Sequence, residues 1–184
     1  MKESFKIISV LTSVCVICAF LLAFVYGSAK EKIAFNAEKA INDAITTLAP
    51  EAKDIEELIL ENNTVYKLFN NGNICIGYAF LAQGQGYQGK IQILSVTNPE
   101  FKKLLGIEII DSVETPGLGA KIKESQFKEQ FKGLNIDKNL ECLKTEPEKN
   151  NQIQAITGAT VSSMAVVNIL NKKIEKLKIL ISAD

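Results

Sequence analysis

The chain has 184 residues with 21 basic and 21 acidic side chains, so its formal net charge at pH 7 is zero. All of the basic residues are lysine, and the sequence contains no histidine, arginine or tryptophan. Balanced charge without a basic cluster argues against a nucleic-acid-binding protein, and the lack of histidine excludes Ser-His and Cys-His nucleophile pairs and imidazole zinc sites.

The N-terminal segment predicts a membrane anchor. No charged residue occurs from Ile7 to Ala29, and as a helix this run would be about 35 Å long at about 1.5 Å per residue, longer than a hydrocarbon core of about 30 Å. A cleaved signal peptide is the alternative, because Gly27 and Ala29 are small, but the apolar region of such peptides has only about 7 to 15 residues. We therefore expect residues 1–29 to be an uncleaved anchor and residues 30–184 to be one domain.

The four cysteines follow no disulfide pattern. Cys15 and Cys18 lie inside the apolar run and are followed by no histidine, so we interpret them as packing residues and not as a haem attachment site. Cys75 and Cys142 stand alone, and the sequence leaves open whether they pair or remain thiols. No pattern of metal ligands is present, so no metal site is expected.

Beyond the anchor the sequence predicts a helix, a hairpin, a further strand and a short helix. The residues that recur at helical spacing before Pro50 are Ile33, Ala37, Ile41, Ile45 and Leu48. Residues 64–83 predict two strands joined by a turn at Asn70 to Asn73. Residues 104–113, LLGIEIIDSV, predict another strand, and a short helix is expected from Glu124 to Phe131.

Residues 84–89, GQGYQG, match the pattern GxGxxG formally. A dinucleotide-binding fingerprint needs a helix directly after the glycines, because the pyrophosphate rests on the N-terminus of that helix. The residues that follow, KIQILSV, have strand character instead. We therefore interpret this stretch as a flexible loop that enters a strand.

Residues 114–122, ETPGLGAKI, form a loop with unusual backbone requirements. Pro116 fixes one backbone angle, while Gly117 and Gly119 permit the backbone to approach a planar or bulky group closely. A structural loop with a turn at Thr115 and Pro116 is the alternative.

The hydroxyl-rich residues 156–163, ITGATVSS, precede the last predicted helix, which runs from Ser162 to about Ile179. Its buried face is marked by apolar residues at helical spacing, namely Val166, Val167, Leu170, Ile174, Leu177 and Ile181. Thr157 to Thr160 would lie at its start, where exposed N–H groups and the helix dipole favour a phosphate or another anion. Ordinary N-capping by one hydroxyl is the alternative, but it leaves Gly158 and the second threonine unexplained.

The motifs ETPGLGAKI and AITGATVSSMAV, in this order, resemble the FMN-binding domain of the G subunit of the Rnf electron transport complex. The C subunit of sodium-translocating NADH:quinone oxidoreductase shares that domain, but the short chain favours Rnf. The resemblance covers essentially the whole chain. It implies an α+β fold with a single N-terminal transmembrane helix, followed by one FMN-binding domain with antiparallel strands and a C-terminal helix. Ser112 and Gln154 stand where family members often have a histidine and an acidic residue.

By this resemblance FMN is attached through a phosphoester bond to Thr160, and Thr157, Gly158 and Ala159 complete the motif. The ring system would lie near the ETPGLG loop, residues 114–119. Its candidate contacts there are Pro116, Gly117, Leu118 and Gly119. Further candidates, for polar contacts or for recognition by a flavin transferase, are Glu114, Thr115 and Lys121. No catalytic residue is expected.

The resemblance also implies the function. The chain would be an electron-carrying flavoprotein subunit of an Rnf-like ferredoxin:NAD oxidoreductase, in which partner subunits couple electron transfer to ion transport, and it would have no independent catalysis. Its partners would be other membrane and soluble subunits and a maturing flavin transferase. It would be a single-pass protein of the cytoplasmic (inner) membrane, with its soluble domain on the extracytoplasmic side.

Two alternatives come from the residues alone. A membrane-anchored binding or assembly module without a cofactor would also suit an anchor followed by a small α+β head, but it has no reason to combine the two motifs. A hydrolase that uses Ser162 or Ser163 lacks an imidazole base, and no Ser-Lys arrangement is apparent.

Overall fold

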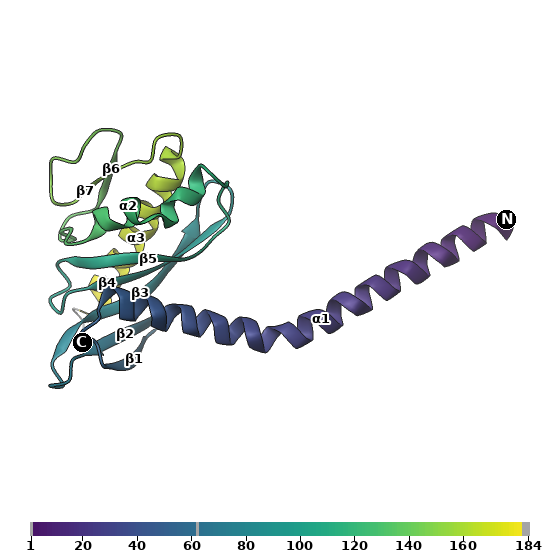
Figure 1. Cartoon of the computed structure of the whole chain (residues 1–184), viewed down its shortest axis with the longest axis horizontal. Helices are drawn as coiled ribbons and strands as arrows, with labels where there is room; N and C mark the ends of the chain where they lie inside the picture. Colours follow the sequence, from purple (N-terminus) through teal and green to yellow (C-terminus); the bar gives the residue numbers. More distant parts are fainter. Residues whose placement is uncertain (1, 62, 182–184) are drawn as a thin grey trace. The chain divides into compact units, whose positions relative to one another are not determined.

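The computed structural model describes residues 2–61 and 63–181. The chain divides into two compact units, Met1–Ala40 and Ile41–Asp184, and the first helix, α1 (Lys2–Leu48), extends from one into the other (Figure 1). The predicted anchor and the amphipathic helix after it are therefore one continuous helix, because no proline interrupts the chain before Pro50. The domain division after residue 29 stays a prediction.

α1 is the membrane-spanning candidate. Its segment Ser4–Leu48 is the one helix in the described part of the chain that is long and apolar enough to cross a membrane. About 20 residues suffice to cross a hydrocarbon core of about 30 Å, so the uncharged run from Ile7 to Ala29 accounts for the span by itself.

The second unit is built on a five-stranded sheet in which neighbours in the sequence are neighbours in space. Its strands are β1 (Asp54–Leu60), β2 (Asn63–Phe69), β3 (Cys75–Gln85), β4 (Lys90–Thr97) and β5 (Leu104–Ser112), and every adjacent pair is antiparallel. The predicted hairpin is confirmed as β2 and β3, with Val65 opposite Phe80. Asn70 closes its turn, because its side-chain oxygen accepts hydrogen bonds from the N–H groups of Gly72 and Ile74 at 2.9 and 3.0 Å.

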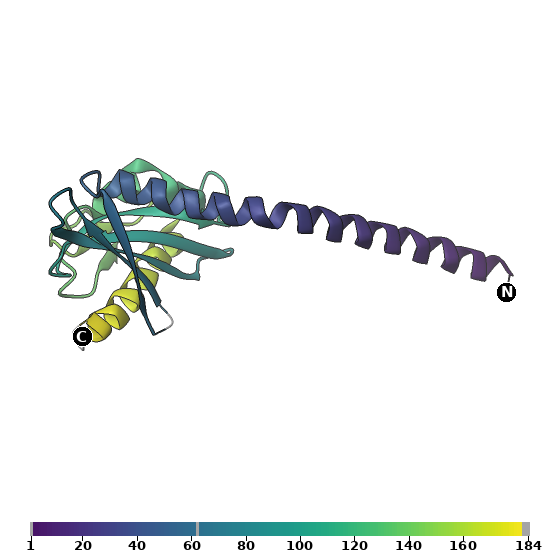
Figure 2. The same ribbon diagram turned by 90° about the horizontal axis from the view of Figure 1, so that it is seen from below.

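Each face of the sheet packs against a different helix (Figure 2). Successive residues of a strand point to opposite faces. On one face the last turns of α1 bury Ala44 and Ile45 against strand residues that include Leu68, Ala79, Leu94 and Val96. On the other face lies α3 (Thr160–Ile181), which packs on a set that includes Val65, Phe80, Ile91 and Ile93. Full burial of each valine, leucine, isoleucine or phenylalanine side chain in these sets contributes about 1.5–3 kcal/mol.

The periodicity of the final helix predicts its packing face correctly. The buried residues of α3 include Val166, Val167, Leu170, Ile174 and Leu177, all of which the spacing selects. Ile181, the last selected position, is half-buried at the edge of the core.

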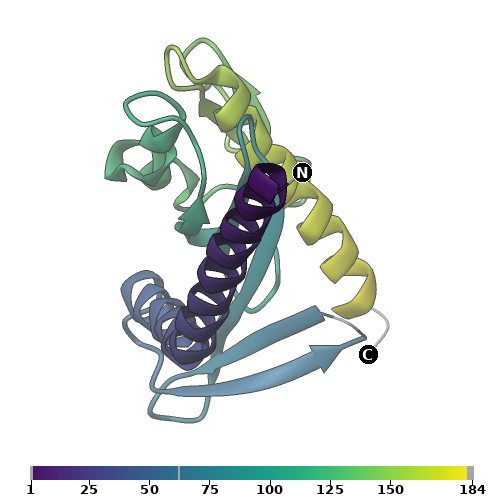
Figure 3. The same ribbon diagram turned by 90° about the vertical axis from the view of Figure 1, so that its right-hand side faces the viewer.

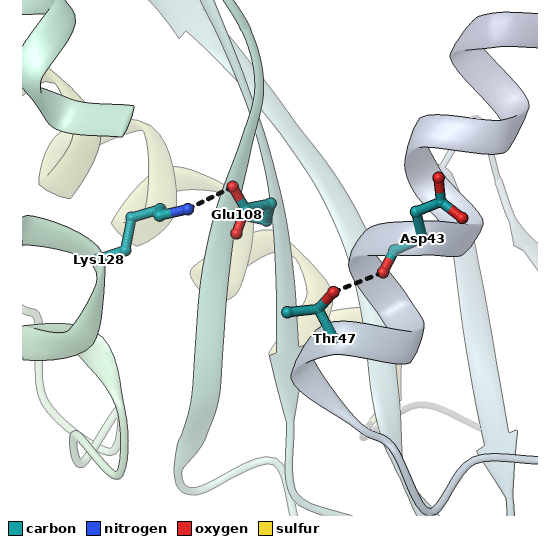
Figure 4. A network of polar contacts seen from close by, with 4 residues as sticks. All are labelled: Asp43, Thr47, Glu108 and Lys128. Carbon is teal, nitrogen blue, oxygen red and sulfur yellow. Dashed lines mark hydrogen bonds and ion pairs between the residues drawn. The ribbon is translucent and has the colours of Figure 1, made fainter. Parts of the chain in front are cut away.

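The segment after β5 is less regular than predicted. The helix expected from Glu124 to Phe131 consists of a short α2 (Ser125–Lys128) and a 3₁₀ turn, η2 (Glu129–Phe131), and it follows another 3₁₀ turn, η1 (Gly119–Lys123). Lys128 forms an ion pair with Glu108 of β5 at 2.5 Å, which ties α2 to the sheet (Figure 4). The same view shows Thr47, at the end of α1, donating a hydrogen bond to the backbone carbonyl of Asp43 at 2.8 Å.

Three strands were not predicted. β1 is an exposed strand at the edge of the sheet, and its side chains alternate only weakly between exposed and half-buried. β6 (Glu141–Leu143) and β7 (Gln152–Gln154) pair in parallel outside the main sheet, and three residues are too few to carry a periodic signal. Cys142 on β6 and Cys75 on β3 are both free thiols.

Candidate functional site

Three segments far apart in the sequence meet at one end of the sheet. They are the turn between β3 and β4 at residues 86–89, the loop after β5 at residues 113–118, and residues 155–159, which lead into α3. Leu118 contacts Gly158, because a Cβ atom built on Gly158 would lie 3.4 Å from Leu118 Cδ2. The two motifs that the sequence singles out are therefore in contact.

Glu114 joins all three segments. Only 7% of this residue is exposed. Its Oε1 atom accepts hydrogen bonds from the backbone N–H groups of Tyr87 and Gln88, at 2.8 and 3.3 Å. Its Oε2 atom accepts a hydrogen bond from the hydroxyl of Ser162 on α3 at 2.7 Å. A buried carboxylate destabilises a fold unless its oxygens are satisfied in this way, so Glu114 acts here as an internal brace. Polar contact of Glu114 with a ligand stays a prediction.

A second hydrogen bond supports the brace. The Thr115 hydroxyl donates to Oε1 of Gln88 at 2.8 Å, which again connects the loop after β5 to the turn between β3 and β4. Within the loop, the N–H groups of Leu118 and Ala120 donate to the carbonyl of Thr115 at 3.2 and 3.0 Å. The loop is thus held both to itself and to its neighbour.

Two glycines make room for the brace. A Cβ atom on Gly86 would lie 2.2 Å from Glu114 Oε1, and one on Gly119 would lie 2.5 Å from Glu114 Oε2 and 2.6 Å from the hydroxyl oxygen of Ser162. Any side chain at either position would displace the carboxylate. Gly84 is required for a different contact, because its Cβ atom would lie 2.6 Å from Ile169 Cγ1 on α3. Gly84 and Gln85 belong to β3, so the loop is shorter than the predicted residues 84–89. The prediction that it leads into a strand is confirmed, because β4 begins at Lys90.

The turn before α3 is held by Ser163. The Ser163 hydroxyl accepts a hydrogen bond from the N–H of Ile156 and donates one to the carbonyl of Ala159, both at 3.0 Å. The N–H of Ala159 donates to the carbonyl of Ile156 at 2.9 Å. Gly158, with φ of +83°, lies in the left-handed region that favours glycine.

The structure separates the hydroxyl groups of residues 156–163 into two kinds. Ser162 and Ser163 are buried, and both hydroxyls are used inside the protein, which argues against the hydrolase alternative. Thr157 is exposed, and Thr160, the first residue of α3, is half-buried. Neither threonine hydroxyl is hydrogen-bonded to another residue that the structure describes.

No side chain among the described residues is found to accept a hydrogen bond from the first N–H groups of α3. Ala159 directly precedes the helix, in the N-cap position, and its methyl group cannot accept a hydrogen bond. The first helical hydrogen bond runs from the N–H of Ser163 to the carbonyl of Ala159, so the N–H groups of Thr160, Val161 and Ser162 have no acceptor within the helix. The structure therefore gives no support to the N-capping alternative, and it leaves a helix end suited to an anion.

Two hollows adjoin this segment. Thr157 and Lys121 line the smaller one, of about 280 Å³, together with Gln130, Gln154 and Ile156. Gln154 and Gln130 are joined there, because the Gln154 N–H donates to the Gln130 side-chain oxygen at 2.7 Å. The larger hollow, of about 1000 Å³, begins at Val161 and Met164 and extends along α3.

Apolar side chains are exposed around the start of α3. Leu118 is 49% exposed, Val161 57% and Met164 47%. Such large apolar side chains at the surface, close together, are typical of a binding surface.

The predicted site residues fall into three groups. Leu118, Gly158 and the start of α3 come together at the surface, and Lys121 shares a hollow with Thr157. Pro116 and Gly117 are exposed in the same loop. Glu114, Gly119 and Ala159 are buried beneath it.

Sequence reasoning missed the internal partners of Glu114. The sequence suggests Ser162 only as a nucleophile, and it gives no reason to expect the backbone of Tyr87 and Gln88 at the site. The glycines of residues 84–89 were the signal that could have revealed these contacts. Their lack of a side chain lets other parts of the chain pack closely against the backbone there. The described residues contain no cluster of metal-ligating side chains.

Comparison with known proteins relates the chain to a family. Residues 86–175, which contain all three site segments, match the family model of the FMN-binding domain. The G subunit of the ion-translocating oxidoreductase complex of Methanosarcina acetivorans is 31% identical over 95% of this chain and 94% of its own length. The G subunit of the proton-translocating ferredoxin:NAD(+) oxidoreductase complex of Clostridium ljungdahlii is also 31% identical, over 94% of this chain and 91% of its own.

Among solved structures, NqrC of Shewanella oneidensis superimposes with a TM-score of 0.54 and 18% sequence identity. The superposition covers 67% of this chain and 65% of that one. At this identity the likeness supports the fold alone, and the predicted α+β domain is confirmed.

Proposed function

Because this chain belongs to the FMN-binding domain family, as a relative of the G subunits of ion-translocating oxidoreductase complexes, we propose that it is the electron-carrying flavoprotein subunit of such a complex. The relation to these G subunits extends over nearly the whole chain, the N-terminal helix included. In the proposal the chain passes electrons within an Rnf-like ferredoxin:NAD oxidoreductase, and partner subunits couple that transfer to ion transport.

The proposed attachment point for FMN is the hydroxyl of Thr160, through a phosphoester bond. The observation that carries this step is the state of the hydroxyls at the start of α3. Ser162 and Ser163 are buried and bonded internally, whereas the Thr160 hydroxyl is bonded to no other described residue and lies at an uncapped helix end. The phosphodiester would keep one negative charge, and the helix N-terminus stabilises such a charge by about 0.3–1 kcal/mol.

The residues around Thr160 fit FMN. Leu118, Val161 and Met164 offer exposed apolar surface for a planar ring, and Gly158 leaves the space between Leu118 and the helix start free of a side chain. Lys121, in the hollow that Thr157 lines, supplies a positive charge for the phosphate side. When bound, FMN supplies transfer of one or two electrons. Glu114 and Ser162 keep the loop and the helix at a constant separation, so the cofactor would meet a preformed surface.

We further propose that α1 anchors the protein in the cytoplasmic membrane as a single-pass subunit, with the domain that starts after it on the extracytoplasmic side. The length and apolar composition of α1 support a span. A covalent bond suits that side, because FMN lost from the domain could not easily be replaced there. A flavin transferase would attach the cofactor, which explains how a chain without histidine acquires it.

The test uses the full-length chain co-expressed with a flavin transferase. We expect a fluorescent flavin band after denaturing electrophoresis for the parent chain and none for Thr160→Val, which removes the hydroxyl and keeps the side-chain volume. The matched control, Thr157→Val, makes the same change at the exposed threonine and should leave an adduct that peptide mass spectrometry locates at residue 160.

A dark parent band would overturn the proposal, provided that the transferase labels a known acceptor in the same cells. That result would favour the membrane-anchored binding or assembly module. A fluorescent Thr160→Val band would still support a covalent flavoprotein, but it would show that FMN is attached to a residue other than Thr160.

A further inference from the structure

We infer that the larger hollow beside α3 is a docking site for an acidic segment of a partner subunit. We name it the lysine groove. Its lining includes Lys172, Lys173 and Lys176 of α3, which face polar residues of the sheet, namely Asn63, Thr64, Gln83, Gln85 and Gln92. This inference rests on the proposed function, in which the chain is one subunit of a multi-subunit complex.

The groove extends along most of α3. It begins at Val161 and Met164, beside Thr160, and it ends at Lys176. At about 1.5 Å per residue, the helix from Val161 to Lys176 is about 22 Å long. This length suits an extended polypeptide of about seven residues at about 3.3 Å per residue, and it exceeds what a small anion needs.

The positive charge in the groove is not balanced from within. None of the described residues that line it is an aspartate or a glutamate, although the whole chain has equal numbers of acidic and basic residues. The ion pair found in the described part of the chain joins Lys128 of α2 to Glu108 of β5, and neither residue lines the groove. Three lysines within five positions of one helix therefore face the groove, and none of them is paired with a carboxylate of the residues that the structure describes.

Lys173 distinguishes the groove from an ordinary solvated helix face. It is half-buried, and its ammonium group donates a hydrogen bond to Oδ1 of Asn63 at the start of β2, at 2.9 Å. Burial, and then the charge of Lys176, lowers the pKa of Lys173. The negative charge of a partner carboxylate would offset both effects, because it stabilises the charged ammonium group. Figure 3 shows α3, in yellow, running beside the sheet.

The amide side chains indicate a polypeptide occupant. Gln83, Gln85, Gln92 and Asn168 carry both donors and acceptors, so they can pair with the main chain of an extended segment while the lysines pair with its carboxylates. The groove also begins beside Thr160, so a segment docked there would bring its subunit close to the proposed FMN.

The first experiment uses the full-length chain in detergent micelles and a fluorescein-labelled peptide of seven residues that alternates glutamate and glycine. Fluorescence anisotropy at low salt should report binding that weakens as salt rises, and a peptide with glutamine in place of glutamate should not bind. The double variant Lys172→Gln with Lys176→Gln changes two exposed lysines and should weaken binding at least about tenfold.

The matched control is Lys102→Gln with Lys103→Gln, which removes the same charge from two exposed positions just before β5. It should change the affinity less than about twofold, since these lysines lie outside the groove. Equal weakening in both variants, or no binding by the parent chain, would overturn the inference. So would complete displacement of the peptide by inorganic phosphate at matched ionic strength, because the groove would then be a small-anion site.

Flavin fluorescence separates this inference from the proposed function. The Lys172→Gln, Lys176→Gln variant should carry covalent flavin as the parent does, yet fewer partner subunits should copurify with it. Normal copurification with normal flavin would refute the docking site and leave the flavoprotein proposal intact. A dark parent band would refute the proposed function irrespective of peptide binding.

Discussion

The brace formed by Glu114 and Ser162 predicts a measurable coupling energy. Ser162→Ala removes one hydrogen bond of 2.7 Å and leaves Glu114 Oε2 without that donor. Both residues are buried, with 7% and 3% of their surfaces exposed, so water cannot readily replace the lost donor. A hydrogen bond to a charged group contributes about 1.5–3 kcal/mol, and we expect the free energy of unfolding to fall by that amount.

Glu114→Gln tests the other side of the same bond. The glutamine oxygen can still accept from the N–H groups of Tyr87 and Gln88, but the interaction with Ser162 is no longer charge-assisted. If the brace acts as one unit, the free energy of unfolding will fall less in the double variant than the sum of the decreases in the two single variants. We expect a coupling energy of about 1–2 kcal/mol between the two positions.

The assay is urea unfolding of the full chain in detergent, followed by tyrosine fluorescence because the chain has no tryptophan. Thr115→Val, which removes the hydrogen bond to Gln88 without touching Glu114, serves as the comparison. Additive losses, with a coupling energy below about 0.5 kcal/mol, would refute the reasoning that Glu114 joins the loop to α3.

Two further predictions concern the backbone and a thiol. Gly158→Ala should lower the free energy of unfolding by about 1–2 kcal/mol, because φ is +83° there. Thermal unfolding measures this decrease. Gly158→Asn should show a smaller decrease, because asparagine tolerates this backbone conformation. Burial raises the pKa of the Cys142 thiol above its ordinary value of 9.0, so the unfolded chain releases that proton first as the pH rises. The free energy of unfolding should therefore fall above about pH 9 until the folded thiol also ionises. Urea titrations at increasing pH should show that Cys142→Ala flattens this decline, and an unchanged slope would contradict the assignment to Cys142.

Elements with a long local pattern were predictable from the sequence. Examples are the uncharged run from Ile7 to Ala29, the hairpin about Asn70 and the packing face of α3. In each of them the same pattern of apolar and polar residues continues over many positions, so the local sequence and the tertiary contacts favour the same structure. The hydroxyl-rich motif that ends at Thr160, the proposed attachment point, could also be recognised in the sequence, because its glycine and threonines are close together in the chain. β6 and β7 were not predictable, since their pairing joins two segments of three residues.

What the tertiary structure alone decided is the role of each polar side chain at the site. Glu114 is an internal brace because folding brings it to Ser162, which lies 48 residues away in the sequence. Contact with Ile156 and Ala159 assigns Ser163 to the turn and leaves Thr160 as the hydroxyl at the helix start. The lysine groove likewise exists only where α3 faces the sheet. Hydrogen bonds and charges act over a few ångströms in space, so their partners depend on the packed fold and not on distance along the chain.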